Sequence, residues 1–280
     1  MNRNILDDLR LKFFKSGSPA MLYIGINVLI FLVGGLIGVV LTLSGNRGWV
    51  DSQIQAYFAF PADLNSLPIK FYTVLTYQFF HADFFHVLFN MLWLYWIGQI
   101  FLEFLKPRQF HFVYLGGGIL GALTFLLLFN TIPAFSGQQA TLIGSSASVM
   151  AVLAATATLV PDYSIRLMFI GELKLKYLIL AYVLLDVISS AGANAGGSIA
   201  HLGGALFGFI FIKLLQNGKD WSAFFERKPK LRVVKNKSPQ KSEFKVNQKE
   251  VDMILDKISK SGYDQLSKEE KETLFKASKN

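Results

Sequence analysis

Six long apolar stretches, separated by shorter polar segments, dominate the first 216 residues of the chain. A lipid bilayer offers the backbone no hydrogen-bond partners, so such stretches cross it as helices of about 20 residues. The pattern therefore predicts an all-α membrane protein with a six-transmembrane-helix bundle. The expected spans are residues 20–44, 84–105, 110–130, 141–160, 175–191 and 197–216.

Arginine and lysine mark alternate connections between these spans. They precede the first span, separate the second from the third and the fourth from the fifth, and follow the sixth, whereas loops 131–140 and 192–196 carry no charge. Basic loops stay on the cytoplasmic side, so both termini are expected there, in a cell (inner) membrane. The basic positions are Arg3, Arg10, Lys12, Lys15, Lys106, Arg108, Arg166, Lys174 and Lys176.

Composition agrees with this prediction. Of the 280 residues, 52% are apolar and only 17% charged, against about 25% in soluble domains. The first apolar stretch is longer than the roughly 7–15 residues of a signal-peptide core, so no cleavable signal is expected. Without cysteine, disulfides and thiolate chemistry are excluded. The semi-apolar first loop, residues 45–75, carries many aromatic rings and is expected in the outer membrane interface.

The C-terminal part is expected to be separate from the membrane part. Residues 219–280 hold 16 Lys/Arg and 10 Asp/Glu, a net charge of +6 that suits either an anionic membrane surface or a solvated tail. Apolar residues at helical spacing and a capping-box pair predict a small helical hairpin. The predicted division is a cytoplasmic segment 1–19, the six-helix membrane domain 20–217, a basic linker 218–248 and the hairpin 249–280.

Three reactive side chains lie near the outer ends of even-numbered spans. His86, Ser146 and His201 occur early in spans two, four and six, which all run from outside to inside. At 1.5 Å per residue, each is expected roughly 3–9 Å deep. Polar residues inside membrane spans are costly and often functional. Their shared depth therefore predicts a site that opens toward the outer side.

Ser146 and His201 suit a nucleophile and its base. A serine hydroxyl needs an adjacent base, and His201 is the only histidine in the last span. The small-residue seam Gly204-x-x-x-Gly208 would press span six against span four. A structural alternative stays open for each residue, because serine and histidine in membrane helices also bond backbone carbonyls.

His86 and Asn90 share one face of the second span at a spacing of i, i+4. Both donate hydrogen bonds, so they suit the oxyanion of a transition state, although a helix–helix polar contact is the alternative. No H-E-x-x-H sequence is present, so zinc is not expected. Asp186 is the only acidic candidate within the spans to orient His201, and the sequence supplies no reason to include it in a triad.

These motifs resemble those of rhomboid intramembrane serine proteases. The resemblance covers about residues 20–216 and rests on Phe80-His81, His86-x-x-x-Asn90, Gly144-x-Ser146 and Ala200-His201-Leu202-Gly203-Gly204. It implies a dyad of Ser146 and His201, an oxyanion site with His86 and Asn90, and a supporting structural role for His81. The chain departs from the family pattern at Ala147, Met150 and Tyr72-Thr73.

The resemblance also implies the activity. The expected protein is a serine endopeptidase that cuts transmembrane segments of other proteins through an acyl-enzyme, with substrates entering between spans two and five. Its partners are transmembrane protein substrates and membrane lipid, without nucleic acid or cofactor, and the oligomeric state is left open. The alternative is a catalytically inactive rhomboid-like protein that binds membrane helices. A transporter is disfavoured, since no inverted repeat or charged pathway is evident.

Overall fold

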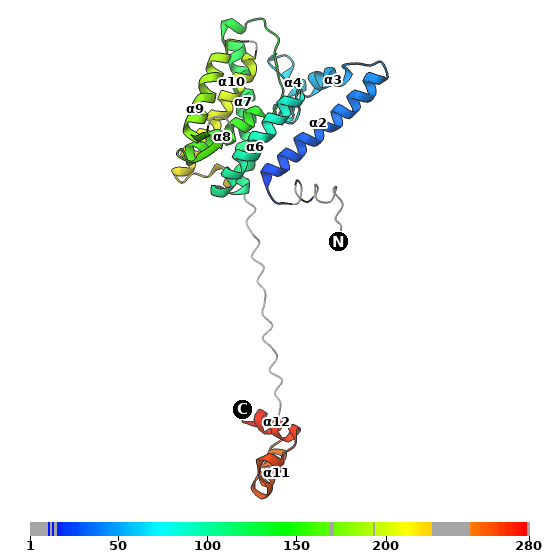
Figure 1. The fold of residues 1–280 in the computed structure, drawn as a ribbon, viewed down its shortest axis with the longest axis vertical. Helices are drawn as coiled ribbons and strands as arrows, with labels where there is room; N and C mark the ends of the chain where they lie inside the picture. The colour runs from blue at the N-terminus through cyan, green and yellow to red at the C-terminus, as the bar shows by residue number, and fades with distance from the viewer. Residues whose placement is uncertain are drawn as a thin grey trace. The chain divides into compact units, whose positions relative to one another are not determined.

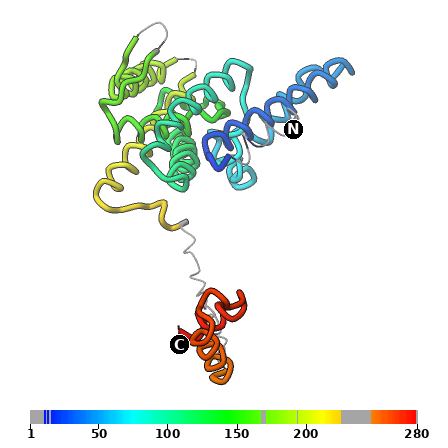
Figure 2. The backbone as a smooth tube through the Cα atoms, turned by 60° about the horizontal axis from the view of Figure 1, so that its bottom comes forward, coloured from blue at the N-terminus to red at the C-terminus, as the bar shows by residue number. Residues whose placement is uncertain are grey.

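The computed structural model describes residues 11, 13, 16–167, 171–192, 194–225 and 247–278. The chain divides into two compact units, Met1–Arg227 and Lys228–Asn280, which are described separately. Most of the described residues in both units are helical (Figures 1 and 2).

Each of the six predicted apolar stretches contains a helix. In the described part of the chain, four helices are long and apolar enough to cross a membrane, namely α2, α6, α7 and α10, whereas α8 and α9 are shorter. The multi-pass character of the chain rests on these four, and the count of six crossings remains a prediction. The helices are α2 (Pro19–Leu43), α6 (Phe84–Phe104), α7 (Pro107–Thr131), α8 (Ser146–Leu159), α9 (Leu175–Ser189) and α10 (Ala195–Gln216).

Helix α8 lies at the centre of the first unit. It packs against α6, α7, α9 and α10, and every residue from Ala147 to Ala157 is buried. Helix α2 packs mainly through its first half, where Asn27 donates a hydrogen bond to the Tyr114 hydroxyl of α7 at 3.2 Å. The second half of α2 leans away from α6, α7 and α8 and toward α3 (Figure 1).

Glycines set the close approach of α8 to its neighbours. A side chain at Gly204 would meet the Ala147 carbonyl, and one at Gly208 would meet the Ala151 carbonyl. The predicted seam therefore does bring α10 against α8, which is the pairing that the position of His201 requires. Gly121 of α7 also leaves room for the Ala147 methyl group, because a Cβ there would lie 2.7 Å from it.

Replacing Gly208 with alanine is expected to destabilise the membrane unit. The new methyl group would overlap α8 backbone atoms that cannot rotate away, and overpacking of this kind costs about 1–3 kcal/mol. The midpoint of thermal unfolding in detergent micelles should fall by roughly 3–10 °C. Gly35→Ala is the matched control, since nothing lies within 4 Å of that position and alanine favours the helix. Equal midpoints for the two variants would contradict this account of the seam.

The fourth span differs from its prediction. Helix α8 begins at Ser146 instead of residue 141, because β2 (Thr141–Leu142) pairs antiparallel with β1 (Phe60–Pro61) of the first loop. The backbone groups before Ser146 are therefore partly satisfied by a distant segment. The all-α prediction was wrong at this point, and again where β3 (Ser164–Leu167) pairs with β4 (Gly171–Lys174).

The first loop contains more helix than its irregular sequence indicates. Its elements connect α2 to α6 and bring β1 beside the segment that leads into α8. Tyr77 is buried there, and its hydroxyl donates to the Gly118 carbonyl of α7 at 2.7 Å. The short helices are α3 (Trp49–Tyr57), α4 (Leu67–Lys70), α5 (Thr73–Thr76) and η2 (Tyr77–Phe79), and η3 (Pro133–Phe135) follows α7.

An acidic residue fastens the far end of α10 to the start of α7. Asp220 accepts hydrogen bonds from Arg108 at 2.8 Å and Gln109 at 3.1 Å, and its other oxygen accepts from Ser222 in η4 (Trp221–Phe225). Partial burial raises the pKa of Asp220, but the bonds from Ser222 and Arg108 outweigh it and hold that pKa below its ordinary value. The start of α7 and the end of α10 therefore lie at one end of the bundle.

The second unit contains α11 (Gln248–Ser261), η5 (Tyr263–Gln265) and α12 (Lys268–Ala277). Helix α12 begins with the expected capping box, in which Ser267 and Glu270 exchange hydrogen bonds. Lys257 of α11 also pairs with Glu270 at 2.8 Å. Most of the predicted basic linker, residues 226–246, lies outside the described residues, as do four predicted basic positions near the N-terminus, Arg3, Arg10, Lys12 and Lys15.

Candidate active site

One cavity of about 660 Å³ gathers the predicted site residues. Its lining comes from α6, α8, α9 and α10 and from the segments just before α6, α8 and α10. Ser146, His201, His86 and Asn90 all contribute to it. In the described residues, no group of three or more histidine or acidic side chains is arranged to hold a metal ion. The other lining residues are Asp83, Phe85, Phe89, Trp93, Ile143, Val149, Met150, Leu153, Tyr182, Asn194 and Gly197.

Ser146 is the first residue of α8, and it is half-buried while its neighbours Ser145 and Ala147 are buried. The N–H groups of a first helical turn have no acceptor within their own helix, so they are available to an anion in the cavity. Among the described hydrogen bonds, none joins the Ser146 hydroxyl to His201. Both residues nevertheless line the same cavity, and catalytic hydrogen bonds in unliganded enzymes are often loose.

His201 contacts Asp186, a residue for which the sequence alone predicted no partner. Its Nδ1 lies 3.0 Å from Oδ1 of Asp186 on α9. The two side chains are 22% and 11% exposed, so both are largely removed from solvent. Because Nδ1 is occupied, Nε2 is the ring nitrogen left for the cavity. The sequence contained one signal of this contact, because Asp186 is an acidic residue within the apolar stretch 175–191.

His86 owes its position to Asp83 and Gly144. Asp83 caps α6 by accepting the His86 backbone N–H at 2.9 Å, which begins the helix at this point. Gly144 has a positive φ of 121°, and a Cβ there would lie 2.6 Å from both Cε1 and Nε2 of His86. The glycine of the Gly144-x-Ser146 motif therefore serves two needs, the left-handed backbone and the space for the imidazole.

Asn90 lies one helical turn after His86 and is buried. Its Nδ2 donates to the His86 carbonyl at 2.9 Å. An amide nitrogen carries two hydrogens, so one donor remains for a ligand in the cavity. The predicted oxyanion pair is thus brought to the cavity on one helix, as its i, i+4 spacing requires.

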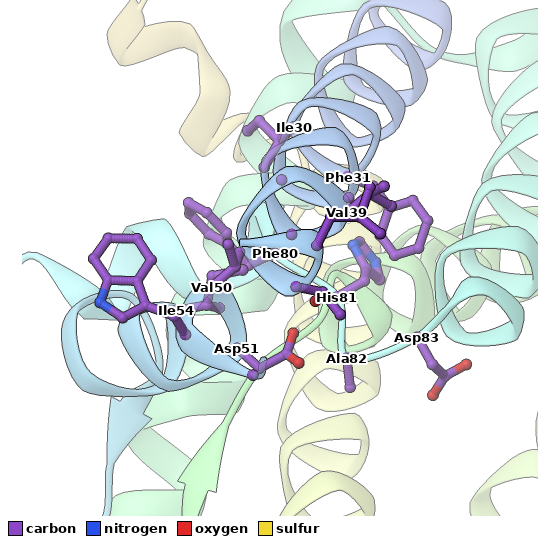
Figure 3. Close-up of a pocket in the computed structure, with 17 residues that line it drawn as sticks. Ile30, Phe31, Val39, Val50, Asp51, Ile54, Phe80, His81, Ala82 and Asp83 are labelled. Atoms are coloured by element: carbon purple, nitrogen blue, oxygen red, sulfur yellow. The ribbon is translucent and has the colours of Figure 1, made fainter. Parts of the chain in front are cut away.

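His81 supports the turn before α8. Its Nε2 accepts the Ser145 backbone N–H at 3.4 Å and lies 3.1 Å from the Ser145 hydroxyl, and its ring contacts His86 edge to face at 5.0 Å. Burial, with a smaller effect of His86, lowers the pKa of His81 to about 3, so the ring is neutral at physiological pH. His81 also borders a separate cavity of about 400 Å³ between α2 and α3 (Figure 3).

A second buried contact, which the sequence did not reveal, fixes the start of α8. Ser148 donates to the side-chain oxygen of Gln78 at 2.8 Å, and the Gly144 N–H donates to the Tyr77 carbonyl at 3.0 Å. Element η2 thereby holds both the glycine before the candidate nucleophile and the first turn after it.

Comparison with known families agrees with these motifs. The rhomboid domain family matches residues 68–217, which is more than half of the chain. The chain belongs to the rhomboid family. This rhomboid match begins in the first loop and ends with α10, so it contains the whole candidate site. Residues 241–280 match a second family, described only as a family of unknown function (DUF6576).

Curated relatives share the rhomboid part. Presenilin-associated rhomboid-like protein A, mitochondrial, of Danio rerio is 31% identical over 139 residues, covering 48% of this chain and 35% of that protein. The Bos taurus and Homo sapiens presenilin-associated rhomboid-like proteins, mitochondrial, are 30% and 28% identical over 145 residues. These matches cover 50% of this chain, but only 37% and 36% of the relatives, so the chain spans little more than a third of their length.

Proposed function

We propose that this rhomboid protein is an intramembrane serine protease that cleaves transmembrane segments of other membrane proteins. The observation that supports the proposal is the meeting of Ser146, His201, His86 and Asn90, from three helices, at one cavity. Membership of the rhomboid family alone would not support this function, because proteins of one fold can differ in activity. The arrangement contains a nucleophile, a base and oxyanion donors, which are the groups that acyl transfer requires.

In the proposed reaction, Nε2 of His201 takes the hydroxyl proton of Ser146 while Oγ attacks the scissile carbonyl carbon. The oxyanion accepts hydrogen bonds from His86, Asn90 and the Ser146 backbone N–H. The C–N bond then breaks, and the leaving amine takes the proton from His201. Water, losing a proton to His201, attacks the resulting ester. The ester C–O bond then breaks, the proton on His201 passes to the departing Ser146 oxygen, and the carboxylic product leaves.

We propose that the substrate approaches between α6 and α9. These two helices both pack against α8, and the rings of Trp93 and Tyr182 meet between them at 5.7 Å. Both rings line the cavity, so their separation would open it sideways toward lipid. A substrate helix must unwind where it meets Ser146, because a helical backbone keeps its carbonyls hydrogen-bonded.

The proposed topology has six crossings of a cell membrane, with both termini in the cytoplasm and the cavity toward the outer side. The pair between Arg108 and Asp220 lies at the end of the bundle where α7 starts and α10 stops. Lys174 and Lys176 pair with Asp162 and lie at the start of α9. Ser146 lies at the start of the preceding helix, α8, which is the end away from the connection to α9. Basic residues thus mark helix ends other than those that carry the cavity.

Covalent labelling tests this function. A fluorophosphonate probe should label the full-length protein in detergent micelles, and peptide mapping should place the adduct on Ser146. His201→Ala should abolish the labelling, because the hydroxyl then lacks its base. A wild-type protein that resists the probe and leaves transmembrane substrates intact would instead favour a rhomboid-like protein that binds membrane helices. An adduct on another serine would refute the assignment of the nucleophile.

A further inference from the structure

Asp186 is an unusual residue for its surroundings. It lies in α9 among leucine, valine and isoleucine, and its carboxylate is 11% exposed. One oxygen contacts His201 at 3.0 Å, and Oδ2 is buried without a hydrogen-bond partner among the described residues. A buried carboxylate is strongly destabilising unless it is paired, and an oxygen without a hydrogen-bond partner adds to that cost. A residue chosen only for packing would avoid both costs.

We propose that Asp186 is the positioning residue for the base, so that the site works as a Ser146–His201–Asp186 triad. The carboxylate accepts the Nδ1 hydrogen of His201, which keeps the proton off Nε2 and directs the Nε2 lone pair to the cavity. It also stabilises the imidazolium that forms when Ser146 loses its proton. This role rests on the proposed protease function, because positioning a base has a purpose only where a proton is transferred.

The arrangement follows from how α9 and α10 pack. The two helices follow each other in the chain and are joined by a short connection. They pack against each other in antiparallel orientation. His201 is therefore held from α9 on one side, while the glycines after it allow α10 to approach α8 on the other. The ring thus contacts the acid on α9 and also lines the cavity that Ser146 lines.

Nuclear magnetic resonance can test the orientation without any substrate. The chain has only four histidines, so ¹⁵N-histidine spectra of the full-length protein in micelles are tractable, with His201 assigned from a His201→Gln variant. We expect neutral His201 to carry its proton on Nδ1. In Asp186→Asn, the side-chain amide can donate to Nδ1, so the proton should move to Nε2. A wild-type His201 protonated on Nε2 would overturn the proposal.

Kinetics test the catalytic consequence. Asp186→Asn should lower kcat for a transmembrane substrate by about 10²-fold or more, with KM changed by less than about threefold, because the base is then in the wrong tautomer. Asp252→Asn, in the second unit and exposed, is the matched control and should retain wild-type kinetics. An Asp186→Asn variant with unchanged kcat would overturn the positioning role even if the tautomer is as expected.

The two readouts keep this inference separate from the proposed function. If the wild-type protein neither labels nor cleaves, the protease function fails and the catalytic role of Asp186 fails with it, whatever the tautomer of His201. If the wild type cleaves and Asp186→Asn matches it, only the triad is wrong. A protein that cleaves, shows the Nδ1–H tautomer and loses kcat in Asp186→Asn supports both.

Discussion

Ser146→Ala and His201→Ala are each expected to reduce cleavage of a transmembrane substrate by about 10⁴–10⁶-fold, and the double variant by no more than either single change. The reason is that the hydroxyl and the imidazole act in one step, so removing either removes the whole contribution of the pair. The measurement is single-turnover cleavage in vesicles with all three variants. Residual cleavage should match in the three, since it would come only from binding and the oxyanion donors.

Two control variants test whether a substitution in the membrane unit lowers cleavage merely by destabilising the protein. Ser190→Ala removes the hydroxyl of a partly exposed serine at the end of α9, which donates to the Val187 carbonyl. His111→Gln changes a histidine that contacts the Tyr23 hydroxyl, and His111 does not line the cavity. Both controls should cleave at close to the wild-type rate. If the cleavage lost in the double variant equalled the two single losses combined, the two residues would contribute independently, and the dyad would be rejected.

Gly144→Ala is expected to have the next largest effect on activity. An alanine at φ of 121° is strained by about 1–3 kcal/mol. Its Cβ would also displace the His86 ring, which lies 2.6 Å from that position. Loss of one oxyanion donor costs about 10²–10³-fold, so the rate of fluorophosphonate labelling should fall by that factor.

A substitution at a second glycine distinguishes the effect of backbone strain from the effect of displacing the His86 ring. Gly137 also has a positive φ, 74°, but nothing lies within 4 Å of a Cβ built there. Gly137→Ala should therefore lower the midpoint of thermal unfolding while leaving the labelling rate unchanged. If Gly144→Ala labels as fast as Gly137→Ala, the contact with His86 has no bearing on the chemistry.

The sequence predicted the helices well because apolar length is a local property. Each of the six expected stretches contains a helix, and the capping box at Ser267 is present. The start of α8 was missed because pairing of Phe60 with Leu142 joins segments 82 positions apart, and no local pattern shows such a contact. The hairpin of β3 and β4 was missed because its short strands carry too few residues for an alternating pattern.

The candidate site was predicted in part. Equal depth and family motifs indicated Ser146, His201, His86 and Asn90, which do line one cavity. The pairing of His201 with Asp186 was not predicted, because it depends on how α9 is rotated about its axis against α10. Sequence spacing fixes which residues share a helix face, but it does not fix which face meets a neighbouring helix.

Under the proposed protease function, the length of α8 bears on where a substrate would be cut. Its 14 residues rise about 21 Å, roughly 9 Å less than the hydrocarbon layer, whereas α6, α7 and α10 are long enough to cross. In the proposed topology the shortfall lies before Ser146, so the candidate nucleophile would lie deeper than the outer ends of the longer helices around it. One additional turn at the start of α8 would move a nucleophile there about 5.4 Å outward, and the proposed cleavage site would then shift three or four residues toward the outer end of the substrate helix.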